Sequence, residues 1–303
     1  MTVSVVSASV LPQRRVRHRR PADDLLPRYV KVPLIVLFAV VIIAPLLYLV
    51  MLSLTPDNEI GAGQIVPSHW DFSHYVFMWS AVPLARGLLN SLLIGGSASL
   101  ISVFIGLGAA YVLARFTFRG RRSYLMSLVG LQTIPGVMIL LPLYVVFAWV
   151  QTKLNVTIVG TYPAIILTYL TFALPFGTWL EFSYLASIPV DFEEAALVDG
   201  ASRLGALRRV VLPLMLPGMA VALIFDFLGA WNDVLFASAL TNTNTQTLAV
   251  AVEAFSYAQA GAALPHYGEL MAAAVLSAVP VVVVYMLLQR YLVSGLTAGG
   301  VKA

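Results

Sequence analysis

Long apolar runs constrain the fold of this chain more than any other feature of its sequence. They cover residues 32–54, 88–113, 125–150, 162–185, 214–240 and 270–291. Each run exceeds the roughly 18 residues needed to cross a hydrocarbon core about 30 Å thick. The composition agrees, since 60% of the residues are hydrophobic and 11% are charged, against about 25% charged in an ordinary globular domain. The sequence therefore predicts an all-α integral membrane protein with six transmembrane helices.

Several of these runs contain proline, including Pro135 and Pro142 in the third run. Membrane helices tolerate proline because neighbouring helices and water satisfy the freed backbone carbonyls. We therefore expect kinks at these prolines and keep each run as one span.

Positive charge predicts the orientation of the spans, because short loops rich in Lys and Arg remain in the cytoplasm. Apart from Arg86 and Lys153, all Lys and Arg residues lie before the first run, after the second, after the fourth, or at the C-terminal end. Both termini and both even-numbered loops are therefore expected in the cytoplasm. This distribution explains the net charge of +4 by membrane topology, with no need for a nucleic-acid partner.

The basic N-terminus could in principle begin a cleaved signal peptide. However, the apolar run at 32–54 is longer than a signal h-region, and no A-x-A-like cleavage site follows it. We expect a retained first span behind a basic tail. There are no cysteines, which excludes disulfides and thiolate metal sites.

The loops at 55–87, 151–161 and 241–269 are then external. The first contains the aromatic residues Trp70, Tyr75 and Trp79, which are typical of a segment lying at the membrane interface. The external histidines are His69, His74 and His266. Their spacing is not that of metal ligands, so we interpret them as ordinary loop residues and predict no metal site and no catalytic site.

The loop between the fourth and fifth runs has the most informative pattern. Pro189 and Asp191 suit a helix start, and Gly200 suits a helix end because glycine adopts positive φ without a Cβ clash. Ser202 is placed to cap a second helix that runs toward Val211. A short helix of small and apolar residues flanked by Glu193, Glu194 and Asp199 can occupy a groove on a partner, although it is also compatible with an amphipathic linker on the membrane surface.

The order of residues in this loop favours the partner-binding interpretation. Glu194-Ala195-Ala196, then Gly200, then Leu212-Pro213 resembles the EAA loop of ABC importer permeases, in particular those of the maltose and multiple-sugar branch. In that family the loop forms a coupling helix that docks on a separate ATPase. The resemblance implies this role for Glu193, Glu194, Ala195, Ala196, Leu197, Asp199 and Gly200, and it implies a type I ABC importer permease fold.

The resemblance extends over residues 30–303 and includes Asn90-Ser91-Leu92, Trp231-Asn232-Asp233 and the C-terminal residues from Thr297 to Lys302. It implies that the C-terminal tail reaches the ATPase interface, with Thr297 and Lys302 as contacts. It also implies that the third external loop meets a solute-binding protein, through Asn242, Asn244 and Gln246.

The chain lacks the G-x-x-x-x-G-K-[ST] loop that cradles nucleotide phosphates. We therefore expect no cofactor here, ATP and Mg²⁺ being bound by partner ATPase subunits, and no enzymatic activity in this chain. We expect the spans to rock between inward-open and outward-open states as the partner ATPase closes and opens.

Ionisable residues inside a bilayer are costly and often functional. Asp226 lies twelve residues beyond Leu214, which at about 1.5 Å per residue is about 18 Å into the span. Asp233 follows on nearly the same face, and Asn232 adds an amide. We predict that these three residues line the solute path, the alternative for Asp226 being a charge paired or neutralised against a neighbouring helix. Glu181 is expected to meet a basic residue near the cytoplasmic end of the fourth span.

Together these features predict three regions. They are a basic cytoplasmic tail at 1–30, a six-helix permease domain at 31–293 with a coupling loop at 189–213, and a cytoplasmic C-terminal tail at 294–303.

The predicted partners are a second permease, two ATPase subunits, an extracytoplasmic solute-binding protein and membrane lipid, in a bacterial or archaeal plasma membrane. The predicted cargo is a carbohydrate. The alternatives are import of a glycerophosphodiester or other polar solute, or a stand-alone secondary transporter or channel, with a membrane-embedded enzyme a distant third.

Overall fold

A computed structural model describes residues 27–64, 66–259 and 266–300, with side chains as far as Tyr291. The described backbone contains helices and connecting turns and no strand. The chain divides after Tyr48 into two compact units, and each is described by itself. The first consists mainly of α1 (Arg28–Leu52), an unbroken helix despite Pro33 and Pro45, as expected for kinks within one span. The basic tail lies almost wholly outside the described residues.

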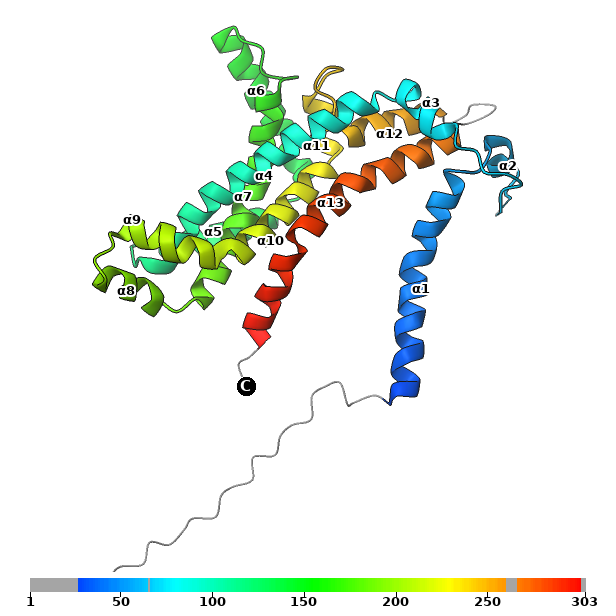
Figure 1. Cartoon of the computed structure of the whole chain (residues 1–303). Helices are drawn as coiled ribbons and strands as arrows, with labels where there is room; N and C mark the ends of the chain where they lie inside the picture. Colours follow the sequence, from blue (N-terminus) through cyan, green and yellow to red (C-terminus); the bar gives the residue numbers. More distant parts are fainter. Residues whose placement is uncertain (1–26, 65, 260–265, 301–303) are drawn as a thin grey trace, which may run out of the picture. The chain divides into compact units, whose positions relative to one another are not determined.

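Three long helices form the centre of the second unit. α4 (Leu84–Arg115), α7 (Tyr162–Ser187) and α10 (Leu212–Trp231) pack side by side, and α13 (Tyr267–Gly300) packs against α10 (Figure 1). Small residues allow the close approach that membrane helices use in place of a hydrophobic driving force. At Gly95 of α4, for example, an added Cβ would already lie 3.5 Å from the Cβ of Ala230 on α10. Close packing of these helices therefore forms the centre of the second unit.

Pro135 divides the third apolar run, so the predicted span at 125–150 is wrong. The chain forms α5 (Arg121–Gln132), turns through Thr133 and Ile134, and begins α6 (Gly136–Leu154) after Pro135. Proline has no N–H and moves the preceding residue out of the helical region, which is why the helix stops here. Within the described chain, α6 alone of this pair is long and apolar enough to cross a membrane.

The predicted span at 214–240 is also misplaced. Its helix ends at Trp231, and a separate short helix, α11 (Leu235–Leu240), follows. Asp233 causes this break, because its carboxylate accepts hydrogen bonds from the N–H groups of Phe236 and Ala237 at the start of α11. At its N-terminal end, this span begins earlier than predicted. A π-helical segment, η2 (Leu207–Val211), joins α9 (Arg203–Ala206) to α10 without a break.

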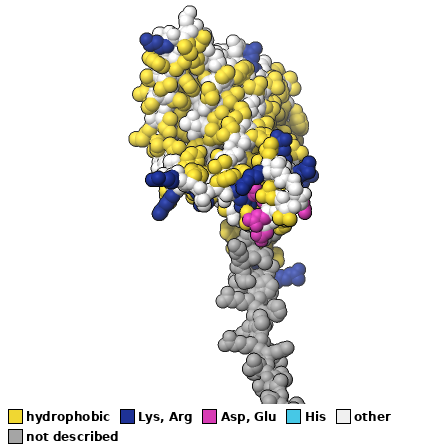
Figure 2. Space-filling view, turned by 90° about the vertical axis from the view of Figure 1, so that its left-hand side faces the viewer, with side chains coloured by type: hydrophobic (Ala, Val, Ile, Leu, Met, Phe, Trp, Pro, Cys, Tyr) yellow, Lys and Arg dark blue, Asp and Glu magenta, His cyan; other side chains and the backbone are white. Residues whose placement is uncertain are grey.

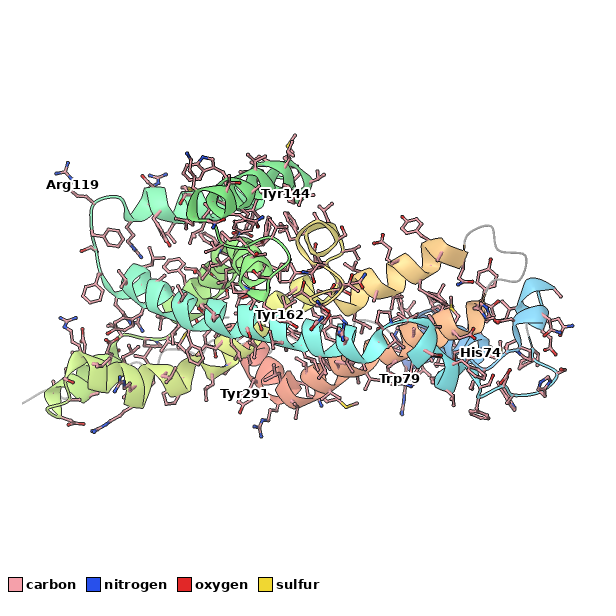
Figure 3. All side chains as sticks on the ribbon, turned by 90° about the horizontal axis from the view of Figure 1, so that it is seen from above. His74, Trp79, Arg119, Tyr144, Tyr162 and Tyr291 are labelled. Carbon is pink, nitrogen blue, oxygen red and sulfur yellow. The ribbon has the colours of Figure 1, made fainter. Side chains whose placement is uncertain are left out.

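The remaining helices are short and lie outside the long spans. They are α2 (Asp57–Gly61), α3 (His74–Ala81), α8 (Asp191–Val198) and α12 (Leu248–Gln259). In Figure 3, His74 of α3 and Arg119, which follows α4, lie at opposite ends of this unit. We call these the α3 end and the α8 end. α13 continues as a helix to Gly300, so the predicted tail at 294–303 begins as part of the last helix, and Lys302 lies outside the described residues.

Six helices in the described chain are long and apolar enough to cross a membrane: α1, α4, α6, α7, the continuous segment from α9 to α10, and α13. The number of spans is as the apolar runs predict, although two sets of boundaries differ. The chain is a multi-pass, all-α membrane protein.

Candidate functional site

The loop at the α8 end folds as the helix, turn and helix that the sequence predicts. α8 ends in a Schellman turn, in which the Gly200 amide donates to the Leu197 carbonyl and the Ala201 amide donates to the Ala196 carbonyl. Gly200 has φ +87°, the left-handed conformation that glycine adopts freely. The Ser202 hydroxyl then accepts a hydrogen bond of 3.1 Å from the Gly205 amide and caps α9. The turn geometry is therefore fixed by Gly200 and Ser202.

Glu193 fastens α8 to the end of α4. Its carboxylate accepts hydrogen bonds from the Tyr111 hydroxyl and, at 3.0 Å, from Arg115 Nε. Arg115 also donates to the Ile188 carbonyl at 3.2 Å, just before α8. Glu193 is only 5% exposed, so its charge points into the protein. The sequence places Glu193 among the acidic residues around the partner-facing surface, and the structure assigns it an internal contact instead.

The opposite side of α8 has no partner in the described chain. Phe192, Ala195 and Val198 follow one another at three-residue intervals and are all exposed, Val198 at 87%. Glu194 and Asp199 flank them and are exposed, whereas Ala196 and Leu197 are half-buried. Figure 2 shows this end of the molecule, with acidic side chains gathered beside basic ones below a largely hydrophobic surface. Of the predicted coupling residues, Glu194, Ala195, Asp199 and Gly200 are therefore available to another protein.

A cavity of about 270 Å³ lies among the membrane helices. Half of its lining residues are aromatic: Tyr169, Phe172, Phe176, Phe225 and Phe236. Asp226 and Asp233 both line it, as their spacing along the chain predicts. The Tyr169 hydroxyl donates to Asp233 Oδ2 at 3.0 Å, whereas Asp226 Oδ2 is buried beside Gly177 and has no hydrogen-bond partner among the described residues. This arrangement combines flat apolar rings with carboxylate acceptors.

Asn232 does not belong to the cavity lining. It is exposed, and its amide donates back to the Leu228 carbonyl of its own helix at 2.9 Å. The structure therefore brings together two of the three residues predicted for the solute path.

Glu181 is fully buried in α7, and neither of its carboxylate oxygens has a hydrogen-bond partner in the described part of the chain. The expectation that it meets a basic residue is wrong for those residues. Its carboxylate lies against Gly106 of α4, where an added Cβ would be 2.7 Å from Glu181 Oε2. The glycine at 106 therefore provides the space that this carboxyl group occupies.

Asn90 organises the polar loop at the α3 end, a role that the sequence did not reveal. Its amide donates to the carbonyls of Asn244 and Gln246, at 2.9 and 2.8 Å, and its own carbonyl oxygen accepts from the Tyr162 hydroxyl at 2.8 Å. Asn242 donates to the Gly160 carbonyl at 2.9 Å. The side chains of Asn242 and Asn244 remain exposed and Gln246 is half-buried, so this loop presents polar groups on an ordered frame.

Solved structures with this fold include a bacterial importer of the acidic polysaccharide alginate, with a TM-score of 0.70 and 23% identity over 87% of this chain and 95% of that one. The MetNI methionine transporter is similar at a TM-score of 0.53 and 19% identity, covering 70% of this chain and 95% of that one. The fold is that of type I ABC importer permeases.

The chain belongs to the family of binding-protein-dependent transport system inner membrane components, whose profile matches residues 102–298. Similar relatives include the diacetylchitobiose uptake permease NgcG of Streptomyces coelicolor, 38% identical over 88% of this chain and 86% of that protein. The trehalose permease SugB of Mycobacterium tuberculosis is 32% identical over 85% of this chain and 92% of that protein. The trehalose/maltose permease MalG of Thermococcus litoralis is 30% identical over 92% and 99%.

Proposed function

We propose that this chain forms half of the translocation pathway of an ATP-driven importer of a sugar or oligosaccharide. The chemistry of the cavity lined by Asp226 and Asp233 carries the proposal. Aromatic faces suit the apolar C–H surfaces of sugar rings, and the carboxylates of Asp226 and Asp233 can accept hydrogen bonds from hydroxyl groups. The relatives named above transport diacetylchitobiose, trehalose and maltose, which supports the same class of cargo.

The α8 end faces the cytoplasm in this proposal. This end carries basic residues, including Arg119, Arg122 and Arg208, and short loops rich in Lys and Arg remain on the cytoplasmic side. The α3 end then faces outward, where its polar loop meets the solute-binding protein through Asn242, Asn244 and Gln246. Both termini are cytoplasmic, and the C-terminal residues Thr297 and Lys302 approach the ATPase.

The exposed face of α8 docks on an ATPase subunit and receives its movement. Phe192, Ala195 and Val198 provide a compact apolar contact, with Glu194 and Asp199 as flanking charges. Movement of α8 reaches the membrane helices through Glu193, which is held by Tyr111 and Arg115 near the end of α4. The chain itself needs no nucleotide and performs no chemistry, since ATP and Mg²⁺ belong to the partner subunits.

The functional unit contains this chain, a second permease, two ATPase subunits and a solute-binding protein. Reconstituting these components in proteoliposomes tests the proposal. Labelled disaccharides and oligosaccharides should enter only with both ATP and the binding protein. Uptake restricted to a labelled glycerophosphodiester would identify a different cargo, and uptake that continues without the ATPase subunits would identify a stand-alone transporter or channel.

A further inference from the structure

The α3 end gathers two histidines and three carboxylates from distant parts of the chain. His74 and Asp71 come from the start of α3, Asp57 from α2, and His266 and Glu269 from the start of α13. They line an open depression of about 800 Å³. Figure 3 shows His74 at this end of the molecule. Sequence spacing alone gives no sign of this cluster, because folding joins residues about two hundred positions apart.

Glu269 is the centre of the cluster and points both of its oxygens at imidazole nitrogens. Glu269 Oε1 lies 3.4 Å from His266 Nδ1, and Glu269 Oε2 lies 3.5 Å from His74 Nδ1. The residue is only 6% exposed, and its Oε2 has no hydrogen-bond partner in the described chain. A buried carboxylate oxygen without a donor is costly, so this group needs a positively charged neighbour.

The tautomer of His74 makes the requirement sharper. Its Nε2 lies 3.2 Å from the Thr55 carbonyl, which can only accept, so this contact is a hydrogen bond only when Nε2 carries a proton. In the neutral ring, Nδ1 then presents a lone pair to Glu269 Oε2. Two acceptors facing each other need a proton or a metal ion between them or beside them. The ring cannot turn away freely, since it packs against the backbone of Gly268, where an added Cβ would lie 2.3 Å from His74 Cε1.

Asp57 is oriented as a ligand would be. Its Oδ1 accepts a hydrogen bond of 2.7 Å from the Gly268 amide, which leaves Oδ2 directed toward His266 Nδ1 at 3.6 Å. One ligand atom from each of Asp57, His266 and Glu269 lies within 4.8 Å of the other two. In a tetrahedral zinc site with bonds of about 2.0 to 2.1 Å, ligand atoms are about 3.3 Å apart. The two distances from His266 Nδ1, 3.4 and 3.6 Å, match this spacing, and the third, between the two carboxylates, is at most 4.8 Å.

We propose that Asp57, His266 and Glu269 bind a divalent transition-metal ion, whose charge also compensates the Glu269 carboxylate that faces the His74 lone pair. The mixed nitrogen and oxygen ligands favour zinc and its neighbours over calcium or magnesium, which prefer oxygen ligands alone. Hydrogen bonds from Ser73 hold the pKa of Asp71 below its usual range, so Asp71 keeps its negative charge beside His74 and adds to the attraction for a cation.

The bound ion would join the loop that carries α2 to the first turn of α13. These two segments also touch through the Asp57 to Gly268 hydrogen bond. An ion that binds the folded state and not the unfolded chain raises stability by mass action. The site therefore predicts that metal stabilises the α3 end of the protein.

Metal binding by the full chain, purified in detergent and stripped with a chelator, tests the proposal. Zn²⁺ is titrated against a chromophoric competitor, using the natural chain, His266→Ala and His69→Ala. His266 is exposed, so its loss should leave folding intact, and His69 is an equally exposed histidine of the first external loop outside the cluster. We expect one saturable site in the natural chain and in His69→Ala, and at least a tenfold loss of affinity in His266→Ala.

Two further measurements separate metal binding from a simple histidine–carboxylate ion pair. Co²⁺ in place of Zn²⁺ should give the strong visible absorption of a four-coordinate site, and Ca²⁺ should not compete. Zn²⁺ should raise the melting temperature of the natural chain and His69→Ala but not of His266→Ala. Absence of saturable Zn²⁺ binding in the natural chain, or equal affinity in His266→Ala, would overturn the proposal and leave the cluster as an ion pair. Neither result depends on whether the chain imports a sugar.

Discussion

The Tyr111 hydroxyl donates a hydrogen bond to the Glu193 carboxylate, joining the short exposed helix α8 to the C-terminal end of a membrane-spanning helix. Arg115 completes the contact one turn further along α4. This contact joins α8 to α4, which in turn packs against α7 and α10, the two long helices that line the cavity. It is the structural basis for the proposed transfer of movement from the ATPase.

Breaking this connection should reduce coupling and stability together. Arg115 and Glu193 form a largely buried ion pair, with side chains 10% and 6% exposed. Arg115→Ala leaves the buried carboxylate without its positive partner, which costs on the order of 3 kcal/mol in such sites. Thermal unfolding should show the loss, and uptake per ATP hydrolysed should fall. Arg122→Ala is a matched control, because Arg122 is exposed on α5. Equal coupling in Arg115→Ala and Arg122→Ala would show that the ion pair transmits nothing.

Gly200→Val should damage transport through the backbone alone. An added Cβ at Gly200 meets no atom within 4 Å, so there is no steric obstacle. The cost comes from φ +87°, which is about 1–3 kcal/mol for an unsuited residue and is largest for a β-branched one. Gly200→Asn should retain much of the uptake because asparagine tolerates the left-handed region. Uptake measured for the two variants should therefore differ strongly, and similar uptake would contradict the assigned role of the turn.

The cavity predicts different outcomes for two neighbouring polar residues. Asp226→Asn should lower uptake at least tenfold while leaving assembly with the ATPase and the basal ATPase rate unchanged, because Asp226 lines the cavity. Asn232→Ala should have little effect, because Asn232 bonds to its own helix and is absent from the lining. Unchanged uptake in Asp226→Asn would remove this residue from the solute path.

The polar loop at the α3 end should depend on Asn90. Asn90→Ala removes two donated hydrogen bonds and one accepted hydrogen bond, each worth about 1 kcal/mol. The melting temperature should fall, and binding-protein-stimulated ATPase activity should fall further as the loop loses its frame. The exposed-residue variant Asn244→Ala should keep the melting temperature. A normal melting temperature in Asn90→Ala would mean that the loop is held in another way.

The sequence predicts the main features of this fold for clear physical reasons. Apolar runs long enough to cross a bilayer can hardly fold otherwise, and Gly200 and Ser202 are strong local signals for a turn and a cap. The break at Pro135 was missed because the apolar character continues across it, while the end of α10 depends on which backbone groups the Asp233 side chain happens to reach. Neither the break at Pro135 nor the end of α10 can be read from the length and hydropathy of an apolar run.

The side-chain contacts between distant segments could not be predicted at all. Glu193 and Glu194 are adjacent acidic residues in sequence, yet one is buried against Arg115 and the other is exposed, and only helix packing separates them. His74 and His266 meet around Glu269 only after α3 and α13 pack together. The burial of Glu181 against Gly106 of α4 was likewise a matter of tertiary position.

The natural absence of cysteine makes the central claim directly measurable. Val198→Cys introduces a single thiol on the exposed face of α8, and Thr157→Cys places the control thiol in the exposed turn between α6 and α7. Each is labelled with a photoactivatable maleimide in the assembled complex, and adducts are identified by mass. The account predicts an adduct with the ATPase subunit from position 198 and none from position 157. An actively transporting complex that gives no ATPase adduct from position 198 would contradict it.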